Sequence, residues 1–257
     1  QQTVPESPSP SPVVETAAAD KNDLTVVRSM ELQYANNFAV DYCANGCKII
    51  TDGAGQKFLW VPEGGEAPDD TGDMTVLQAP LTKLGCFSTT HATLFHAIGA
   101  LDKVSLVTTD KDKWHIEQVA QQIEDGTTTY VGKNSAPDYE LISAAAPQII
   151  LISANTMHGS DEVLAKLDEL GIPYIADSQH LENHPLGRVE WVKLVGALLD
   201  MEEEADAYFD EEVQRVNAVA ESVAGESEHP TILQTYIFKG TVYVRNGGDY
   251  VNKMLEL

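Results

Sequence analysis

The chain has 257 residues, of which 43% are hydrophobic and 22% charged, so it is long enough for one large globular domain or two modest ones. Its 40 acidic and 16 basic residues give a formal net charge of -24, which disfavours nucleic acid and anionic membranes as electrostatic partners. No stretch is long and apolar enough to span a membrane, and 3 cysteines do not make a disulfide framework.

Residues 1–22 are rich in Pro, Ser, Ala and acids and contain too little apolar surface for a core, so we expect a disordered linker. Such a linker suits a surface-tethered protein, although a frayed terminus would look the same. From residue 30 to residue 62 the pattern alternates, which predicts short antiparallel strands. We expect their turns at 36–37, 45–46 and 53–55.

Cys43 and Cys47 flank Asn45-Gly46, a strong hairpin turn signal. They could form a disulfide in an oxidising compartment. A zinc site would need more ligands, and no second Cys/His pair follows at a suitable spacing, so a hairpin without metal is favoured. Cys86 lies in an apolar run and is expected to be buried.

The hydrophobic pattern changes after residue 80, where apolar runs alternate with helical patterns. The runs expected to form buried strands are 83–88, 104–109, 128–132, 147–153 and 173–178. The helical patterns lie at 89–100, 112–124, 138–146 and 160–170. This alternation predicts a parallel sheet covered by helices on both faces.

A helical stretch follows from His184 to Val223, with a change of direction allowed near 199–202. After Gly225, two β patterns and the start of a helix are expected to open another domain. So few residues cannot bury a core, and we therefore expect the protein to continue beyond Leu257.

Four segments carry a family resemblance when taken in order. They are KLGCFSTTHATLFHAIGALDKVSLVTT (83–109), VGKNSAPDYELISAAAPQIILIS (131–153), DEVLAKLDELGIPYIADS (161–178) and VGALLDMEEEADAYFDEE (195–212). The set resembles the substrate-binding proteins of ABC importers for iron–siderophores, haem and cobalamin. Gln148 stands where that family usually has Asp, and the expected β meander at 30–62 is not a standard part of the pattern.

The resemblance implies an α/β protein with two lobes, each a parallel sheet flanked by helices, joined by one long helix. We expect a linker at 1–22, an N-terminal lobe at 23–183 that includes the meander, an interlobe helical segment at 184–224 and the start of a C-terminal lobe at 225–257. The ligand is expected between the lobes. Open parallel sheets bind ligands beyond the carboxyl ends of their strands, which points to the same place.

The loops after the predicted strands therefore supply the candidate ligand-binding residues. Ser88, Thr89 and Thr90 follow the first strand at a helix start, where free N–H groups and hydroxyls favour an oxygen-rich ligand, although a plain N-cap is the alternative. Trp114 follows the second strand and would offer a flat apolar face, or would simply pack a helix against the sheet. Lys133 and Asn134 follow the third strand in a very acidic chain.

Asn155, Met157 and His158 follow the fourth strand, and Met and His are the axial ligands of some haems, although a polar loop with one buried Met is favoured. The fifth strand is followed by a polar stretch, 177–180, that includes Gln179. Arg188 works against the helix dipole at the start of its helix, so we expect it to pair with an acid or with the ligand.

In the expected second lobe, Tyr236, Tyr243 and Arg245 lie on or just after strands and suit recognition of carboxylates and metal-bound oxygens, although they could be structural. Glu140 lies in a first helical turn, where the dipole stabilises it by less than about 1 kcal/mol. In the family that the chain resembles, an acid at this helix start meets an arginine of the permease, so Glu140 is the docking candidate.

The chain lacks the phosphate-binding patterns GxGxxG and GxxxxGK[ST], the nucleophile elbow GxSxG and the zinc motif HExxH. We therefore expect no catalysis and no resident cofactor or metal. The leading hypothesis is an extracytoplasmic, membrane-anchored or periplasmic monomer, lipid-tethered in its precursor, that passes a ferric siderophore, haem or corrinoid to an ABC permease. A tetrapyrrole metallochelatase on a related fold, or a sensory or adhesion module, are the alternatives.

Overall fold

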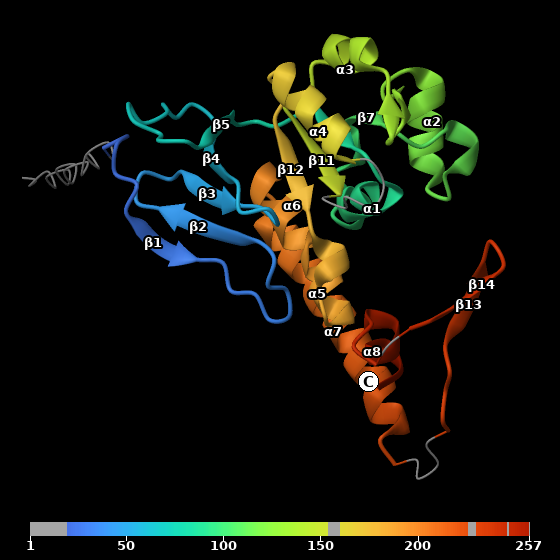
Figure 1. Ribbon diagram of the computed structural model, residues 1–257. Helices are drawn as coiled ribbons and strands as arrows, with labels where there is room; N and C mark the ends of the chain where they lie inside the picture. Colours follow the sequence, from blue (N-terminus) through green and yellow to red (C-terminus); the bar gives the residue numbers. More distant parts are fainter. Residues whose placement is uncertain (1–19, 154–159, 226–229, 246, 257) are drawn as a thin grey trace, which may run out of the picture.

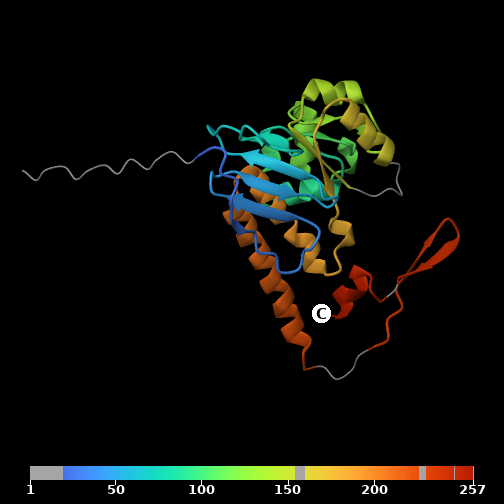
Figure 2. The same ribbon diagram turned by 60° about the vertical axis from the view of Figure 1, so that its left-hand side comes forward.

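The computed structural model describes residues 20–153, 160–225, 230–245 and 247–256. An N-terminal sheet lies beside an α/β lobe, and a long helix leads from them to a small C-terminal unit (Figures 1 and 2). Among the described helices, none combines the length and the apolar character that crossing a bilayer requires.

The N-terminal sheet has five strands in sequential order. They are β1 (Val26–Ser29), β2 (Ala39–Cys43), β3 (Lys48–Thr51), β4 (Lys57–Val61) and β5 (Thr75–Gln78). The neighbours from β1 to β4 are antiparallel, as predicted, whereas β5 runs parallel to β4. The sheet therefore extends beyond the expected range of 30–62 at both ends.

The first of the expected strands, between residue 30 and the turn at 36–37, is wrong, because the backbone there has other partners. Glu190 accepts hydrogen bonds from the backbone N–H groups of residues 33, 34 and 35, each at 2.8 Å. Glu182 accepts those of residues 36 and 37 at 3.1 Å. These N–H groups are thus satisfied by carboxylates about 150 residues away instead of by a neighbouring strand.

The Asn45-Gly46 hairpin is confirmed. The Cys43 N–H donates to the Cys47 carbonyl over 2.8 Å, and Gly46 adopts φ +85°, a left-handed conformation that glycine tolerates. Both cysteines are free and buried, and burial raises the pKa of each thiol. The described part of the chain contains no group of three or more His, Cys, Asp or Glu side chains placed to hold a metal.

The five predicted buried strands are confirmed as one parallel sheet with the order β12-β11-β6-β7-β8. These strands are β6 (Leu84–Cys86), β7 (Val104–Val107), β8 (Thr129–Tyr130), β11 (Ile149–Ser153) and β12 (Tyr174–Asp177). A small hairpin of β9 (Gly132–Lys133) and β10 (Ala136–Pro137) follows β8.

Helices cover both faces of this sheet, as the alternating pattern predicted. The helices are α1 (Thr89–Ala97), α2 (Glu117–Asp125), α3 (Tyr139–Ala145) and α4 (Ser160–Glu169), with short 3-10 turns η1 (Leu101–Lys103), η2 (Lys111–Lys113) and η4 (Gln179–Leu181). One face packs with α1 and α2 in the main core, and the other packs with α3 and α4 in a second apolar cluster. Alternate residues of β11 enter the two clusters, as the two-residue repeat of a strand requires.

The helical stretch expected from 184 to 223 consists of three helices. They are α5 (Pro185–Glu190), α6 (Val192–Leu199) and α7 (Glu202–Val223). The chain changes direction at Asp200, within the range 199–202 where the sequence allows it, and Asp200 adopts a left-handed conformation with φ 59° and ψ 40°. The additional break, at Trp191, was not expected.

Two side chains of the N-terminal sheet bind the end of α6. The Lys48 ammonium donates to the Ala197 carbonyl over 3.0 Å, and the Trp60 indole N–H donates to the Leu198 carbonyl over 2.9 Å. The last carbonyls of a helix have no partner within the helix, so these bonds stabilise the end of α6. They also fasten the N-terminal sheet to the lobe.

The C-terminal unit consists of the antiparallel hairpin of β13 (Thr235–Phe238) and β14 (Thr241–Val244), followed by α8 (Tyr250–Glu256). Both views show the hairpin standing away from the parallel sheet (Figures 1 and 2). In contrast, α8 packs against α5, which brings the C-terminal unit to the α/β lobe.

Candidate functional site: a cavity at the carboxyl ends of the parallel strands

The strand order places the candidate site. The first and fourth strands of the parallel sheet, β6 and β11, are neighbours, so the chain leaves them toward opposite sides. In open parallel sheets, the crevice beyond the carboxyl ends at such a switch point is the usual ligand site. Helix α1 begins here, directly after β6, and η4 follows β12.

A cavity of 410 Å³ lies at this position, within the size range of small-molecule sites. Four elements besides α1 contribute to its wall, which brings parts of the chain about 160 residues apart to one place. The polar and aromatic lining residues are Thr89, Thr90 and Thr93 from α1, Gln179 from η4, Arg188 from α5, Tyr208 from α7 and Tyr250 from α8.

Arg188 is the charged residue of this wall. Its terminal amine donates to the His180 carbonyl over 2.7 Å, and its guanidinium carbon lies 3.4 Å from the centroid of the Tyr250 ring. Its Nε is buried without a hydrogen-bond partner, and no described carboxylate forms an ion pair with it. Burial lowers the pKa of Arg188, but an arginine stays charged at neutral pH. The guanidinium therefore has no acidic partner among the described residues, which leaves its charge available to an anionic ligand group.

The three residues predicted at the start of α1 divide between two roles. Ser88 is the N-cap, since its hydroxyl oxygen accepts the Thr90 N–H over 3.2 Å. Thr89 and Thr90 line the cavity. The hydroxyl of Thr93, one turn later, donates to the Thr89 carbonyl over 3.0 Å.

A buried polar network lies between α1 and the end of β12. The Asp177 carboxylate, 1% exposed, is 3.1 Å from the Nε2 of His91, which is fully buried. The same carboxylate accepts the Gln179 backbone N–H over 2.7 Å and its side-chain amide over 2.5 Å. Burial alone would raise the pKa of Asp177, but the hydrogen bond and charge of His91, with the two bonds from Gln179, lower it overall. Asp177 is therefore ionised at neutral pH.

Several predicted ligand-binding residues lie outside this cavity. Trp114 packs against the main core, and its indole N–H donates to the Thr109 carbonyl over 3.0 Å. Lys133 and Asn134 are exposed on and beside the β9–β10 hairpin. Their contact with a ligand stays a prediction.

The C-terminal candidates are also elsewhere. Tyr236 and Tyr243 stack on each other across the β13–β14 hairpin, with ring centroids 5.0 Å apart. Arg245 forms an ion pair of 2.7 Å with Asp249. Asn155, Met157 and His158 lie outside the described residues.

Arg188, Thr89 and Thr90, which the sequence offered as candidates, line one cavity, whereas the sequence contains no reason to select Tyr208 or Tyr250. Tyr208 lies on the apolar side of the acidic helix α7, a position that indicates packing against the core. Tyr250 reaches the cavity only because α8 packs on α5. Gln179 could have been chosen, because it follows a predicted strand directly.

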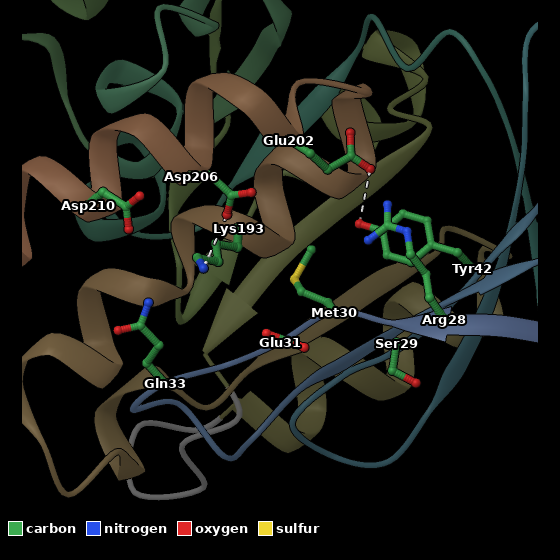
Figure 3. Close-up of a pocket in the computed structure, with 10 residues that line it drawn as sticks. All are labelled: Arg28, Ser29, Met30, Glu31, Gln33, Tyr42, Lys193, Glu202, Asp206 and Asp210. Atoms are coloured by element: carbon green, nitrogen blue, oxygen red, sulfur yellow. Dashed lines mark hydrogen bonds and ion pairs between the residues drawn. The ribbon is translucent and has the colours of Figure 1, made fainter.

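A second cavity, of 470 Å³, lies between β1 and α7 (Figure 3). Its two basic residues are both engaged. The guanidinium carbon of Arg28 lies 3.4 Å from the centroid of the Tyr42 ring, and Lys193 forms an ion pair of 3.1 Å with Asp206. Burial and the charge of Glu202 raise the pKa of Tyr42 to about 12, so its hydroxyl remains a donor to Glu202. We place the candidate ligand site at the first cavity, called the cleft below, because it lies beyond the carboxyl ends of the parallel strands.

The structure is thus an α/β fold with a cavity at one edge of its parallel sheet. Residues 86–257, more than half of the chain, match the family described as periplasmic binding protein. The chain therefore belongs to that family.

Two curated relatives come from Methanocaldococcus jannaschii. Uncharacterized lipoprotein MJ0878 is 34% identical over 175 residues, which are 63% of this chain and 41% of the relative. Uncharacterized lipoprotein MJ0872 is 23% identical over 209 residues, which are 79% of this chain and 52% of the relative. The chain spans about half the length of the curated relatives it matches.

Similar solved structures confirm the fold. A possible iron-binding (periplasmic solute-binding) protein of Staphylococcus epidermidis has a TM-score of 0.55 at 18% identity, covering 68% of this chain and 64% of its own. The IsdE protein of S. aureus, solved in complex with heme, has a TM-score of 0.52 at 12% identity, covering 68% and 62%. At such identities the likeness concerns the fold alone.

Proposed function

We propose that the protein is the extracytoplasmic solute-binding component of an ABC importer, which captures a metal chelate in the cleft and delivers it to a membrane permease. The observation that carries this proposal is the guanidinium of Arg188, which has no acidic partner among the described residues, in the wall of a 410 Å³ cavity at the switch point of the sheet. The proposed chelate is a ferric siderophore, haem or a corrinoid. Binding and release involve no chemical step.

The chemistry of the cavity suits such a ligand. The guanidinium provides charge-assisted hydrogen bonds to anionic oxygens, and Tyr208 and Tyr250 provide flat apolar faces. Two solved relatives support the class, since one is described as possibly iron-binding and the other was solved with heme. Most of the binding energy would come from burial of a bulky ligand.

The direct test is calorimetric titration of a panel of ferric siderophores, haemin and cobalamin into the protein. We expect one class to bind and Arg188→Ala to weaken that binding at least about tenfold, as expected when one charge-assisted bond is lost. Arg215→Ala is the matched control, because Arg215 is exposed on α7 and pairs with Glu211 and Glu212. Absence of binding across the panel would overturn the proposal.

The organisation around this lobe belongs to the same proposal. We assign residues 23–183 to an N-terminal lobe, 184–224 to the interlobe segment and 225–257 to the start of a second lobe, behind a linker at 1–22. Both curated relatives are lipoproteins, which supports tethering of a monomeric protein to the membrane by an N-terminal lipid.

Glu140 is the proposed contact with the permease. It is exposed in the first turn of α3, where the Asp138 carboxylate caps the helix by accepting the N–H groups of Glu140 and Leu141. It lies outside the cleft lining, so Glu140→Lys should impair transport while the ligand dissociation constant stays unchanged. Uptake assays with the cognate permease, beside calorimetry, check this. Normal transport by the variant would contradict the docking role.

A further inference from the structure

Gln179 is the link between the cleft and the buried network under it. Its side chain lines the 410 Å³ cavity, and its amide nitrogen is 2.5 Å from Oδ2 of Asp177. Asp177 in turn lies 3.1 Å from Nε2 of the fully buried His91. All three residues are at most 9% exposed, so solvent does not compete for these bonds.

The charge of Asp177 determines which end of the Gln179 amide faces the cleft. A carboxylate only accepts hydrogen bonds, so the amide must turn its NH2 group toward Asp177. The carbonyl oxygen, Oε1, then points away from Asp177. No described group donates to Oε1, and Gln179 lines the cavity, so this acceptor remains for a group of the ligand.

We infer that Asp177, paired with His91, is a positioning residue that fixes Gln179 so that the cleft offers an acceptor beside the donors of Arg188. A ligand that satisfies both carries an anionic oxygen group next to a hydrogen-bond donor. The simplest such group is an α-hydroxycarboxylate, with its carboxylate on Arg188 and its hydroxyl donating to Oε1 of Gln179. This inference rests on the proposed function, since it concerns the same cleft.

Citrate and tricarballylate are a matched pair of probes, because they carry the same three carboxylates and differ in the hydroxyl of citrate. A site built to bind a hydroxyl discriminates against an analogue that lacks it. We expect calorimetry to show citrate binding about tenfold more tightly, the ratio for one net hydrogen bond. Gln179→Met, which keeps the side-chain length but removes the acceptor, should abolish this ratio by weakening citrate alone.

Asp177→Asn tests the positioning role, because an Asn amide can donate to Gln179 and so allows its amide to turn round. This variant should also lose the preference for citrate. Gln121→Met is the control for the Met substitution, since Gln121 lies on the exposed part of α2 and bonds Asp125. If circular dichroism shows that Asp177→Asn does not fold, Gln179→Met alone tests the inference.

The inference is overturned if the parent protein binds neither probe, if it binds both equally, or if Gln179→Met keeps the preference. The chelate panel separates this failure from failure of the proposed function. If the protein binds a ferric chelate but binds citrate and tricarballylate equally, only the role of Gln179 is contradicted. Absence of all chelate binding contradicts the solute-binding role itself.

Discussion

Glu190 and Glu182 are buried carboxylates that hold a loop by its backbone. Glu190 is fully buried and accepts three backbone N–H groups, while Glu182, 3% exposed, accepts two and also the Trp191 indole N–H over 3.0 Å. Hydrogen bonds to a charged acceptor are roughly twice as strong as neutral ones. The two carboxylates therefore connect the N-terminal sheet to the helices after β12.

Removal of Glu190 should be costly, because it leaves three N–H donors without a partner. The Ala35 N–H is buried, whereas those of residues 33 and 34 are partly buried. An unsatisfied buried donor costs about 1–3 kcal/mol, so Glu190→Ala should lower the free energy of unfolding by about 2 kcal/mol or more. Urea denaturation measures this. Glu203→Ala, at an exposed position in the first turn of α7, should stay within about 0.5 kcal/mol of the parent. Similar losses for both variants would contradict the role of Glu190.

Asp177 should make stability depend on acid pH. Its pKa in the folded protein is lowered from the ordinary value of 3.8, so the ionised carboxylate is more stable in the folded than in the unfolded state. This contribution is present above the unfolded value and is lost as the pH falls through the folded value. The stability difference between the parent and Asp177→Asn, from urea midpoints, should therefore shrink from about pH 6 to about pH 3. A difference that stays constant would argue against it.

At the scale of elements, the contact of α6 with α7 depends on the absence of a side chain at Gly196. A Cβ there would lie 2.6 Å from the Ala205 Cβ and 2.9 Å from the Met201 carbonyl oxygen, closer than real Cβ contacts. The Met201 N–H also donates to the Gly196 carbonyl over 2.9 Å as the chain turns at Asp200. The turn between the two helices is therefore tightly packed.

Gly196→Ala sets two effects against each other. Alanine favours a helix interior by about 1 kcal/mol over glycine, whereas overpacking a tight contact costs about 1–3 kcal/mol. Because the obstacles include backbone and a fully buried alanine, we expect net destabilisation of about 1 kcal/mol or more, measured by thermal or urea unfolding. Gly225→Ala, with nothing near its added Cβ, is the control. A stabilised Gly196→Ala variant would contradict the packing argument.

The elements that the sequence predicted are those with a local cause. The five parallel strands follow from continuous apolar runs, and the hairpin at Asn45-Gly46 follows from its turn residues. The expected strand between residue 30 and the turn at 36–37 fails because Glu190, far along the chain, accepts the N–H groups of residues 33–35. The break at Trp191 likewise follows from tertiary packing, since its indole bonds Glu182. Neither effect has a local signal.

At the scale of the whole molecule, the same distinction applies to the candidate site. Thr89, Thr90 and Arg188 could be predicted, because each follows from a local rule on helix starts or strand ends. The aromatic part of the wall could not, because it depends on how α7 and α8 return to the lobe. The N-terminal sheet is bound to the end of α6 through Lys48 and Trp60.

The central claim, that the cleft retains a metal chelate through Arg188, is tested most directly by retention. The protein and its Arg188→Ala variant are incubated with each coloured chelate, passed through a desalting column and examined by visible absorption. We predict that one chelate class stays with the parent at about one per protein, and that the variant loses most of it. A colourless parent, or equal retention by both proteins, would contradict the claim.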